Sequence, residues 1–181
     1  GQPMNWEVFM KDSHKKVEGF HFLPPGLAAW INSFIPEQNY DGLIPWTPLE
    51  KPLSEASFAL VTSAGISCKG DEPFDMRREK NDPTWGEPSF RKIPRDATDN
   101  DICVNHLHIH TSYIREDMNV ILPIARFAEF EQEGLIGRLA DTHYSFYGFQ
   151  WESDRFLDQA IAPMAEQMSR EQVDAVLLTP A

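Results

Sequence analysis

Residues 56–65 read ASFALVTSAG, and this short, mostly apolar run decides the fold that the sequence predicts. A continuous apolar run bounded by small residues is typical of a strand that is buried on both faces, as in a parallel sheet. Because the run ends in Ser63, Ala64 and Gly65, the strand is expected to open into a tight loop. We therefore start from one buried strand and ask what surrounds it.

The second half of the chain alternates between patterns typical of strands and of helices. DICVNHLHIH (101–110), THYSFYGF (142–149) and VDAVLLTPA (173–181) are predicted strands. Two amphipathic segments are predicted helices, one with Pro123 in its first turn and one from Ser153 to about Met168, interrupted by Pro163. Gly134 fits a helix stop. This alternation predicts an α/β fold, with a mainly parallel sheet flanked by helices in a Rossmann-like three-layer arrangement.

The predicted last strand reaches Ala181, so the sequence stops where parallel strands carry their ligand sites. We expect one of two explanations. Either the chain is a piece of something longer, or another subunit completes the edge of the sheet.

Charge and cysteine content exclude several classes of function. The chain of 181 residues has 16 Lys and Arg against 28 Asp and Glu, a formal net charge of −12, which disfavours nucleic-acid and anionic-membrane partners. No apolar run approaches the roughly 20 residues of a membrane span. Two cysteines without a CxxC pair are typical of a protein in a reducing cytoplasm, so we expect a cytoplasmic location.

Two regions before the second half have unusual compositions. Residues 1–53 are rich in proline and aromatic residues, with one short helix expected near 27–34, and we predict an N-terminal arm that packs on a core domain of residues 54–181. Residues 70–101 are dense in charge, Gly and Pro without a sustained period. A loop of this length is expected to be a lid, a binding loop or a disordered insertion, and Phe74, Trp85 and Phe90 favour a loop that packs.

Three histidines recur at every second position in NHLHIHT (105–111). In a strand, His106, His108 and His110 would share one face and point into a polar site at its carboxyl end. Imidazole is the commonest protein ligand for transition metals, so Zn or Fe is a candidate cofactor, with His143 or a carboxylate such as Glu116 or Asp117 completing the ligands. A substrate pocket with a general acid or base and a partly exposed polar face stay open as alternatives.

Small residues follow the first predicted strand, where a ligand can approach the backbone of Ser63 and Gly65 closely. The surrounding sequence is neither GxGxxG nor GxxxxGK[ST], and Ser63 lacks a GxSxG context, so nucleotide binding and a hydrolase triad have little support. A tight exit from the strand is the alternative. Cys68 follows the first strand and is predicted to be exposed, whereas Cys103 alternates into the second strand and is predicted to be buried. Because Cys68 has no resolving partner in sequence, an inert thiol is predicted there, with a nucleophile as the alternative.

Several blocks together resemble a known family. ALVTSAGISCKGDEPFD, PSFRKIP, the histidine segment, DMNVILPIARFAEFEQEGLIG, HYSFYGF and VDAVLLTPA occur in the order seen in the selenoprotein B family of the glycine, sarcosine, betaine and D-proline reductases, including relatives without selenium. The resemblance covers roughly residues 53–181. It implies reductive cleavage of a carbon–nitrogen bond in an amino acid or its N-methylated derivative, by a selenol or thiol, with other subunits accepting the cleaved group.

The resemblance also implies a substrate pocket. Its walls would include Ser63 and Gly65, the histidine segment with His108 and His110 in catalytic roles, and the pair Asp117 and Asn119. Arg91 in SFRKIP would bind a substrate carboxylate, because its guanidinium matches a carboxylate with two parallel hydrogen bonds. The sequence departs from the family in the redox motif, which family members carry after the block similar to VDAVLLTPA, whereas this chain has no cysteine after Cys103.

Three functions therefore stay open from the sequence. The first is a component of, or an enzyme related to, an amino-acid reductase with a small amino-acid-like substrate. The second is a non-catalytic binding subunit that completes its sheet with a partner, as a homo-oligomer or with another protein. The third is a metal-dependent lyase or oxygenase built on the histidine triplet.

Overall fold

The computed structural model describes residues 22–34, 47–82, 85–107, 109–150 and 152–181. These residues fall into two units, 1–46 and 47–181, and each is described by itself. In the first unit the described residues form the helix α2 (Pro25–Phe34), which confirms the helix predicted near 27–34. Residues 1–21 and 35–46 of the predicted arm lie outside the described residues, so the packing of the arm on the core stays a prediction.

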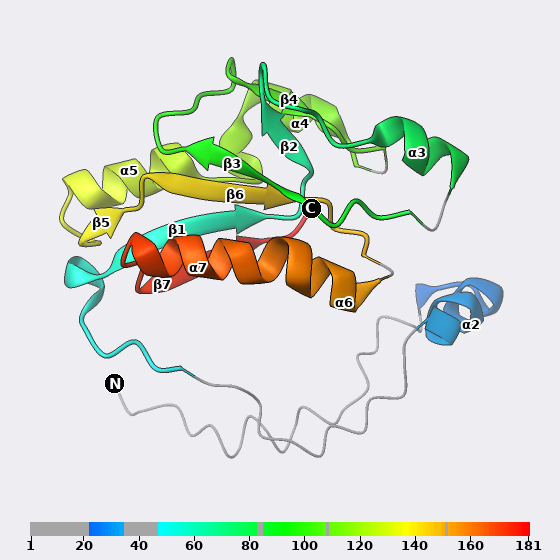
Figure 1. Ribbon diagram of the computed structural model, residues 1–181, viewed down its shortest axis with the longest axis horizontal. Coiled ribbons are helices and arrows are strands. Elements are labelled where there is room, and N and C mark those ends of the chain that lie inside the picture. The colour runs from blue at the N-terminus through cyan, green and yellow to red at the C-terminus, as the bar shows by residue number, and fades with distance from the viewer. Residues whose placement is uncertain (1–21, 35–46, 83–84, 108, 151) are drawn as a thin grey trace. The chain divides into compact units, whose positions relative to one another are not determined.

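The second unit is built on a curled, mostly parallel sheet whose central strand is β1 (Ser57–Thr62) (Figure 1). Every residue of β1 except Phe58 is buried, as the apolar run predicts. β1 pairs in parallel with β5 (Arg138–Leu139), β6 (Thr142–Phe146) and β7 (Ala175–Thr179). The prediction of a mixed α/β fold with a mainly parallel sheet is therefore confirmed.

Two short strands share one side of β1. β5 pairs with Ser57 and Phe58, and β6 pairs with Val61 and Thr62, so the middle of β1 faces the junction between them. The ring of His143, which is fully buried, fills this junction, and its Nδ1 accepts a hydrogen bond of 3.2 Å from the backbone N–H of Leu60. β7 occupies the other side of β1 along its length.

The prediction of a long loop over residues 70–101 is wrong in part. This segment contains α3 (Met76–Asn81), capped by the Asp75 side chain, and β3 (Phe90–Pro94), which pairs antiparallel with β6. Only Ile93 of β3 is fully buried, and Arg91 and Lys92 lie at the centre of this strand of five residues. Its sequence therefore lacks the apolar pattern that would predict a strand. As predicted, Phe74 anchors the segment and is 3% exposed.

The prediction of one strand over residues 101–110 is also wrong beyond residue 104. β4 (Ile102–Val104) pairs with β2 (Ile66–Cys68) in a separate two-stranded antiparallel sheet. The strand ends because Asn105 turns toward Gly65, whose carbonyl accepts a 2.9 Å hydrogen bond from the Asn105 N–H. His110 then forms the N-cap of α4 (Thr111–Glu116), so the period of two in the histidine segment does not reflect a strand.

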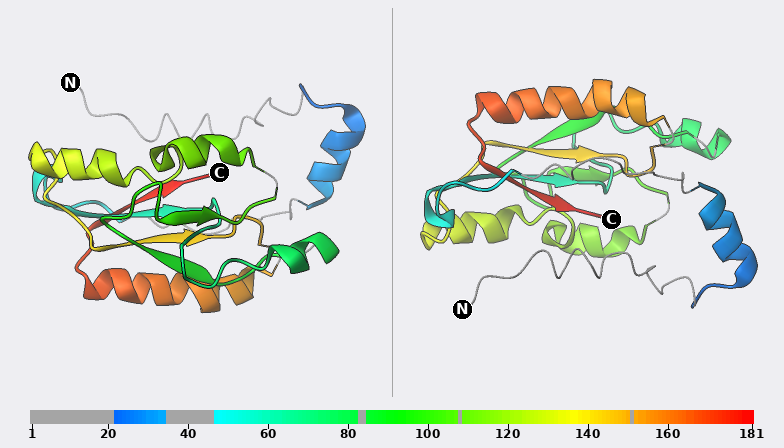
Figure 2. Two further views of the ribbon diagram at one scale, coloured as in Figure 1. Left: turned by 90° about the horizontal axis from the view of Figure 1, so that it is seen from above. Right: turned by 90° about the horizontal axis from the view of Figure 1, so that it is seen from below.

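Helices cover both faces of the main sheet (Figure 2). On one face, α4, η3 (Met118–Val120) and α5 (Ile124–Gln132) enclose a core that includes Leu60, Ile93 and Leu122. On the other, a helical segment packs on Val61 and Tyr144 through Ala160 and Met164. This segment is α6 (Ser153–Phe156), a π turn (Leu157–Ile161) and α7 (Ala162–Arg170), so the helix changes its winding just before Pro163, as predicted.

Two further features complete the unit. A short turn, η2 (Leu53–Glu55), leads into β1, and Gly134 adopts a positive φ of 72° after α5, in agreement with the predicted helix stop. Among the described residues, the helices are all too short or too polar to cross a membrane.

Candidate functional site

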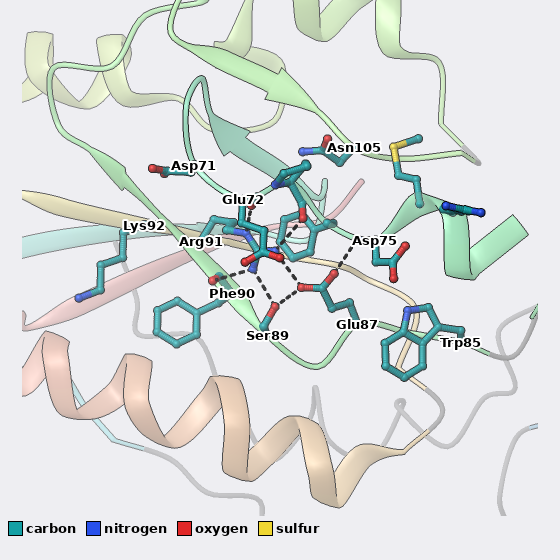
Figure 3. A pocket seen from close by; sticks show the side chains of 14 residues that line it. Asp71, Glu72, Asp75, Trp85, Glu87, Ser89, Phe90, Arg91, Lys92 and Asn105 are labelled. Atoms are coloured by element: carbon teal, nitrogen blue, oxygen red, sulfur yellow. Dashed lines mark hydrogen bonds and ion pairs between the residues drawn. The ribbon is translucent and has the colours of Figure 1, made fainter.

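A wide cleft lies where β3 begins and β4 ends. Because β3 runs antiparallel to β6, with Phe90 opposite Phe146, its first residues lie at the carboxyl end of β6, where ligands bind in open α/β sheets. The cleft has a volume of about 1170 Å³. Its lining includes Phe74, Trp85, Ser89, Phe90 and Asn105, four acidic residues (Asp71, Glu72, Asp75, Glu87) and three basic ones (Arg77, Arg91, Lys92) (Figure 3).

The guanidinium of Arg91 is the best-held group in this cleft. Its Nε donates to the carbonyl of Glu72 at 2.6 Å, and its Nη2 donates to the carbonyl of Pro73 at 3.1 Å. Nη1 donates to the Ser89 hydroxyl at 2.7 Å and to the Phe90 carbonyl at 3.1 Å. The guanidinium also lies over the ring of Phe74, 4.1 Å from its centroid. These contacts fasten the loop before α3 onto β3.

The carboxylate of Glu87 forms an ion pair with Arg91. Oε1 of Glu87 is 2.8 Å from Arg91 Nη2 and also accepts a short hydrogen bond from the Ser89 hydroxyl. Oε2 accepts a 2.6 Å hydrogen bond from the backbone N–H of Asp75. The two side chains are only 13% and 16% exposed, so this ion pair is largely shielded from water. The predicted role of Arg91, binding a substrate carboxylate, requires exchange with Glu87.

Gly65 brings the loop after β1 against the histidine segment. It has a φ of +63°, its N–H donates to the Phe146 carbonyl at 3.0 Å, and a Cβ at this position would lie 2.9 Å from the Asn105 carbonyl oxygen. Only glycine fits this conformation and this close approach without strain. The side chain of Asn105 donates to the Ser67 hydroxyl at 2.8 Å. Gly65 therefore allows the close approach of Asn105, which lines the cleft, and the predicted contact of a ligand with the Gly65 backbone stays a prediction.

His106 is half-buried beside this wall. Its ring stacks on the ring of Tyr147, with centroids 4.8 Å apart and an interplanar angle of 22°. The Tyr147 hydroxyl donates a short hydrogen bond to Glu79, a buried carboxylate on α3. Burial and the Glu79 carboxylate raise the pKa of Tyr147 above its ordinary value, so the hydroxyl stays protonated. Tyr147 thus ties α3, β6 and the histidine segment together.

Of the three predicted metal ligands, His106 and His110 lie among the described residues. His110 is exposed, with Nδ1 2.7 Å from the Ser112 hydroxyl and its ring 5.0 Å from that of Tyr113. His108 lies outside the described residues. Among the residues that the structure does describe, no group of three His, Cys, Asp or Glu side chains can hold a metal ion. Zn or Fe at the triplet stays a prediction, because it depends on His108.

The other predicted site residues lie away from the cleft lining. Ser63 follows β1, where its hydroxyl accepts a 3.0 Å hydrogen bond from the Ala181 N–H. Asp117 accepts hydrogen bonds from the backbone and side chain of Asn119, which lower the pKa of the Asp117 carboxyl. Asn119 in turn accepts from the Ala125 N–H at 3.0 Å, at the start of α5. These contacts give Asp117 and Asn119 a structural task.

The two cysteines lie in different environments. Burial, and secondly the Asp71 carboxylate, raise the pKa of Cys68, which disfavours the nucleophilic thiolate. Cys103, predicted to be buried, is exposed on β4 and lines a second cavity of about 460 Å³ together with Lys69 and Arg115. The prediction that Cys103 is buried is therefore wrong, whereas the inert character of Cys68 stays a prediction.

Sequence reasoning missed three residues of this site, Glu79, Glu87 and Tyr147. Glu87 lies four positions before Arg91, but that spacing carries no meaning outside a helix. Glu79 and Tyr147 are 68 positions apart and meet only through the fold. Asn105 was visible only as the first letter of the histidine segment.

Comparison with known proteins places the chain in a family. The family described as Glycine/sarcosine/betaine reductase selenoprotein B matches residues 34–181. D-proline reductase subunit gamma of Acetoanaerobium sticklandii is 36% identical over 134 residues, which are 74% of this chain and 52% of that protein. Glycine reductase complex component B subunit gamma of Carboxydothermus hydrogenoformans is 33% identical over 75% of this chain and 30% of its own length.

The same subunit of Symbiobacterium thermophilum is 32% identical, over 31% of its length. The chain thus spans about half the length of the first of these relatives and less than a third of the other two. No solved structure matches it. The matched residues contain the whole sheet and the cleft, and on this basis the chain belongs to the glycine/sarcosine/betaine reductase selenoprotein B family.

Proposed function

We propose that the chain is the substrate-binding part of a reductase component that cleaves the C–N bond of an amino acid or an N-methylated amino acid. The observation that carries this proposal is the cleft at the carboxyl end of the sheet, where a shielded guanidinium lies among four carboxylates. An amino acid needs both kinds of charge, a cation for its carboxylate and anions for its ammonium group. The named relatives are subunits of glycine and D-proline reductases, which fits this choice of ligand.

Reductive cleavage adds two electrons and two protons across the C–N bond, so a reductant must reach the cleft. Burial and the Asp71 carboxylate raise the pKa of Cys68, and neither Cys68 nor Cys103 lines the cleft. We therefore assign the reducing selenol or thiol to a group other than these two cysteines. In this proposal the cleft supplies binding and orientation.

Binding measurements test the proposal first. Calorimetric titration of the purified chain with glycine, sarcosine, betaine and D-proline should show saturable binding of at least one of them. Acetamide, which carries neither charge, and methylamine, which supplies only the ammonium group, serve as controls. Equal heats for the controls and all four amino acids would contradict the proposal. Cleavage is then assayed with a dithiol and partner subunits, by loss of the amino acid and release of amine.

A second function, that of a binding subunit which completes its sheet with a partner, has its own supporting observation. Among the described strands β7 pairs only with β1, and its outer residues Val176 and Leu178 are 42% and 69% exposed. Such an edge favours pairing with a further strand. Light scattering tests it. A monomeric mass, unchanged in Leu178→Lys, together with no co-purifying protein from the native source, would exclude this function.

Two finer predictions from the sequence stay with this proposal. Helices on both faces of the sheet support a Rossmann-like three-layer arrangement, although β3 runs antiparallel and β2 and β4 form a sheet of their own. A metal at the histidine triplet requires His108, and metal analysis of protein purified without a histidine tag, repeated on His108→Ala, tests it.

A further inference from the structure

We propose that Glu87 occupies a carboxylate-binding site of the cleft and that the carboxylate of a ligand binds there by displacing it. The inference deepens the proposed function, on which it rests only for the identity of the ligand as an amino acid. The site itself is argued from geometry alone. It consists of three donors, the Arg91 guanidinium, the Ser89 hydroxyl and the backbone N–H of Asp75.

These donors surround a carboxylate completely. One oxygen of Glu87 accepts from Arg91 and Ser89, and the other accepts from Asp75, so both oxygens are bound from two different segments of the chain (Figure 3). Hydrogen bonds of this kind to an ionised group are shorter and stronger than neutral ones. Nothing in the arrangement requires the carboxylate to be that of a glutamate, because every donor binds an oxygen.

Arg91 would stay in place without Glu87. Four further acceptors hold its guanidinium, namely the carbonyls of Glu72, Pro73 and Phe90 and the hydroxyl of Ser89. Its side chain is only 13% exposed, so displacement of Glu87 leaves a shielded positive charge without an anion. An unpaired charge in such surroundings is costly, and this cost favours the entry of another anion.

Glu87 can leave without unfolding its segment. The backbone of Glu87 is held independently, since its carbonyl accepts a 2.8 Å hydrogen bond from Gln150 Nε2. The neighbouring Gly86 packs so closely on Phe149 that a Cβ would lie 1.9 Å from the Phe149 carbonyl oxygen. The side chain therefore rotates about a fixed backbone, and both Glu87 and Arg91 line the open cleft from which a ligand arrives.

A second arginine–glutamate pair, Arg95 and Glu131, lies outside the cleft lining and serves as a control. Arg95 donates to Glu131 Oε2 at 2.5 Å, and Glu131 Oε1 accepts from the Leu139 N–H at 3.2 Å, so this carboxylate also binds one arginine and one backbone N–H. Neither Arg95 nor Glu131 lines the cleft. Removal of Glu131 thus costs a similar ion pair without opening a carboxylate site to ligands.

Chemical rescue tests the inference. Glu87→Ala deletes a group the size of acetate, and the melting temperatures of this variant, Glu131→Ala and the unmutated protein are measured with sodium acetate, sodium chloride or acetamide. Acetate well above its dissociation constant should raise the melting temperature of Glu87→Ala by about 3 °C or more over chloride. Acetamide should not, and acetate should shift the unmutated protein and Glu131→Ala by less than about 1 °C.

The inference is overturned if Glu87→Ala responds to acetate no more than Glu131→Ala does. Should Glu87→Ala fail to fold, Glu87→Gln keeps the volume and removes the charge, and its Arg91 Nε–H resonance is then followed by NMR. A saturable acetate-dependent shift supports the site, and an unmoved resonance rejects it. Rescue by acetate without any binding of glycine, sarcosine, betaine or D-proline would keep the carboxylate site and reject the proposed function.

Discussion

Two arginine–glutamate pairs lie at opposite ends of β3, and they differ in what surrounds them. Arg91 and Glu87 lie at the start of the strand, beside the cleft, with side chains 13% and 16% exposed. Arg95 and Glu131 lie just past its end, where β5 and α5 meet, with side chains 36% and 26% exposed. The same two residue types therefore form a shielded pair beside the cleft at one end and a partly solvated pair at the other.

The difference follows from the direction of β3. Because β3 is antiparallel to β6, one end of it lies at the carboxyl ends of the parallel strands and the other at their amino ends. Ligand sites occur at the former, whereas residues at the latter serve stability. The surroundings of an arginine–glutamate pair, rather than its residue types, therefore determine whether it is suited to bind a ligand or to stabilise the fold.

Removal of each arginine should separate the pairs most strongly. Arg91→Met is expected to cost about 3–5 kcal/mol in the free energy of unfolding, because it breaks a shielded pair and releases the loop before α3. Arg95→Met should cost only about 1 kcal/mol, because its pair is open to solvent. Urea titrations followed by circular dichroism give both values. Equal losses would mean that the two ends of β3 do not differ as described.

Acidification should weaken the sheet between the two pairs. Burial, and secondly the positive charge of Arg95, lower the pKa of His143 to about 4, while Glu171 and Asp141 act in the opposite direction. The folded state therefore binds this proton later than the unfolded state, so stability is fully present above about pH 6.5 and decreases as the pH falls toward 4.

The expected loss over this interval is about 3 kcal/mol. Unfolding titrations between pH 7 and pH 4 measure it, with His143→Asn as the control, since Asn keeps an acceptor for the Leu60 N–H but does not titrate. An identical slope in the variant would contradict the assignment. In Arg95→Met the pKa of His143, followed by NMR, should rise.

Two tyrosines of β6 and its exit provide a further contrast between the cleft and the support. Tyr147→Phe should cost about 1–3 kcal/mol, because the buried Glu79 loses the hydroxyl that donates to it. Tyr144→Phe should be neutral or slightly stabilising, because within the described part of the chain its buried hydroxyl has no hydrogen-bond partner. Thermal unfolding of both variants measures the two changes in stability. A larger loss of stability in Tyr144→Phe than in Tyr147→Phe would contradict these hydrogen-bond assignments.

The smallest effect is expected from two glycines with positive φ. Gly70→Ala should cost about 1 kcal/mol, since φ is +97° but no atom lies within 4 Å of the added Cβ. Gly65→Ala should cost about 1 kcal/mol more, because the methyl group also pushes on the Asn105 carbonyl of the cleft wall. The free energies of unfolding of the two variants measure these costs. Equal costs would show that the Asn105 carbonyl moves away from the added methyl group without loss of stability.

The sequence predicted those parts of the fold whose patterns are long. Strand β1 is a buried apolar run, and α5 has an amphipathic period with a glycine stop, so both could be found without contacts. β3 could not, because Arg91 and Lys92 interrupt its apolar residues, and the contacts of Arg91 with Glu72, Pro73 and Glu87 are invisible in a linear pattern. The alternating histidines led to a wrong strand prediction, because alternation indicates a strand only where pairing with a neighbouring strand continues. Here the N–H of Asn105 donates to the Gly65 carbonyl, and the pairing of β4 with β2 ends at Val104.

The candidate site was predictable only where a residue type carries its own meaning. Arg91 suits a carboxylate wherever it lies, and it does line the cleft. Ser63, Asp117 and Asn119 were placed by their position in the family blocks, and their hydrogen bonds now serve the backbone at Ala181, Asn119 and Ala125. The carboxylate at Arg91 is held by donors from two segments, Asp75 before α3 and Ser89 with Arg91 at the start of β3, which only the folded chain brings together.

The central proposal is that Arg91, at the cleft end of β3, binds the carboxylate of an amino acid. An NMR titration of the nitrogen-15-labelled chain with glycine, sarcosine, betaine and D-proline tests it most directly. We expect at least one of these ligands to shift the side-chain resonance of Arg91 and the backbone resonance of Asn105 saturably, while that of Arg95 stays in place. Equal shifts at Arg91 and Arg95, or none at Arg91, would contradict the claim.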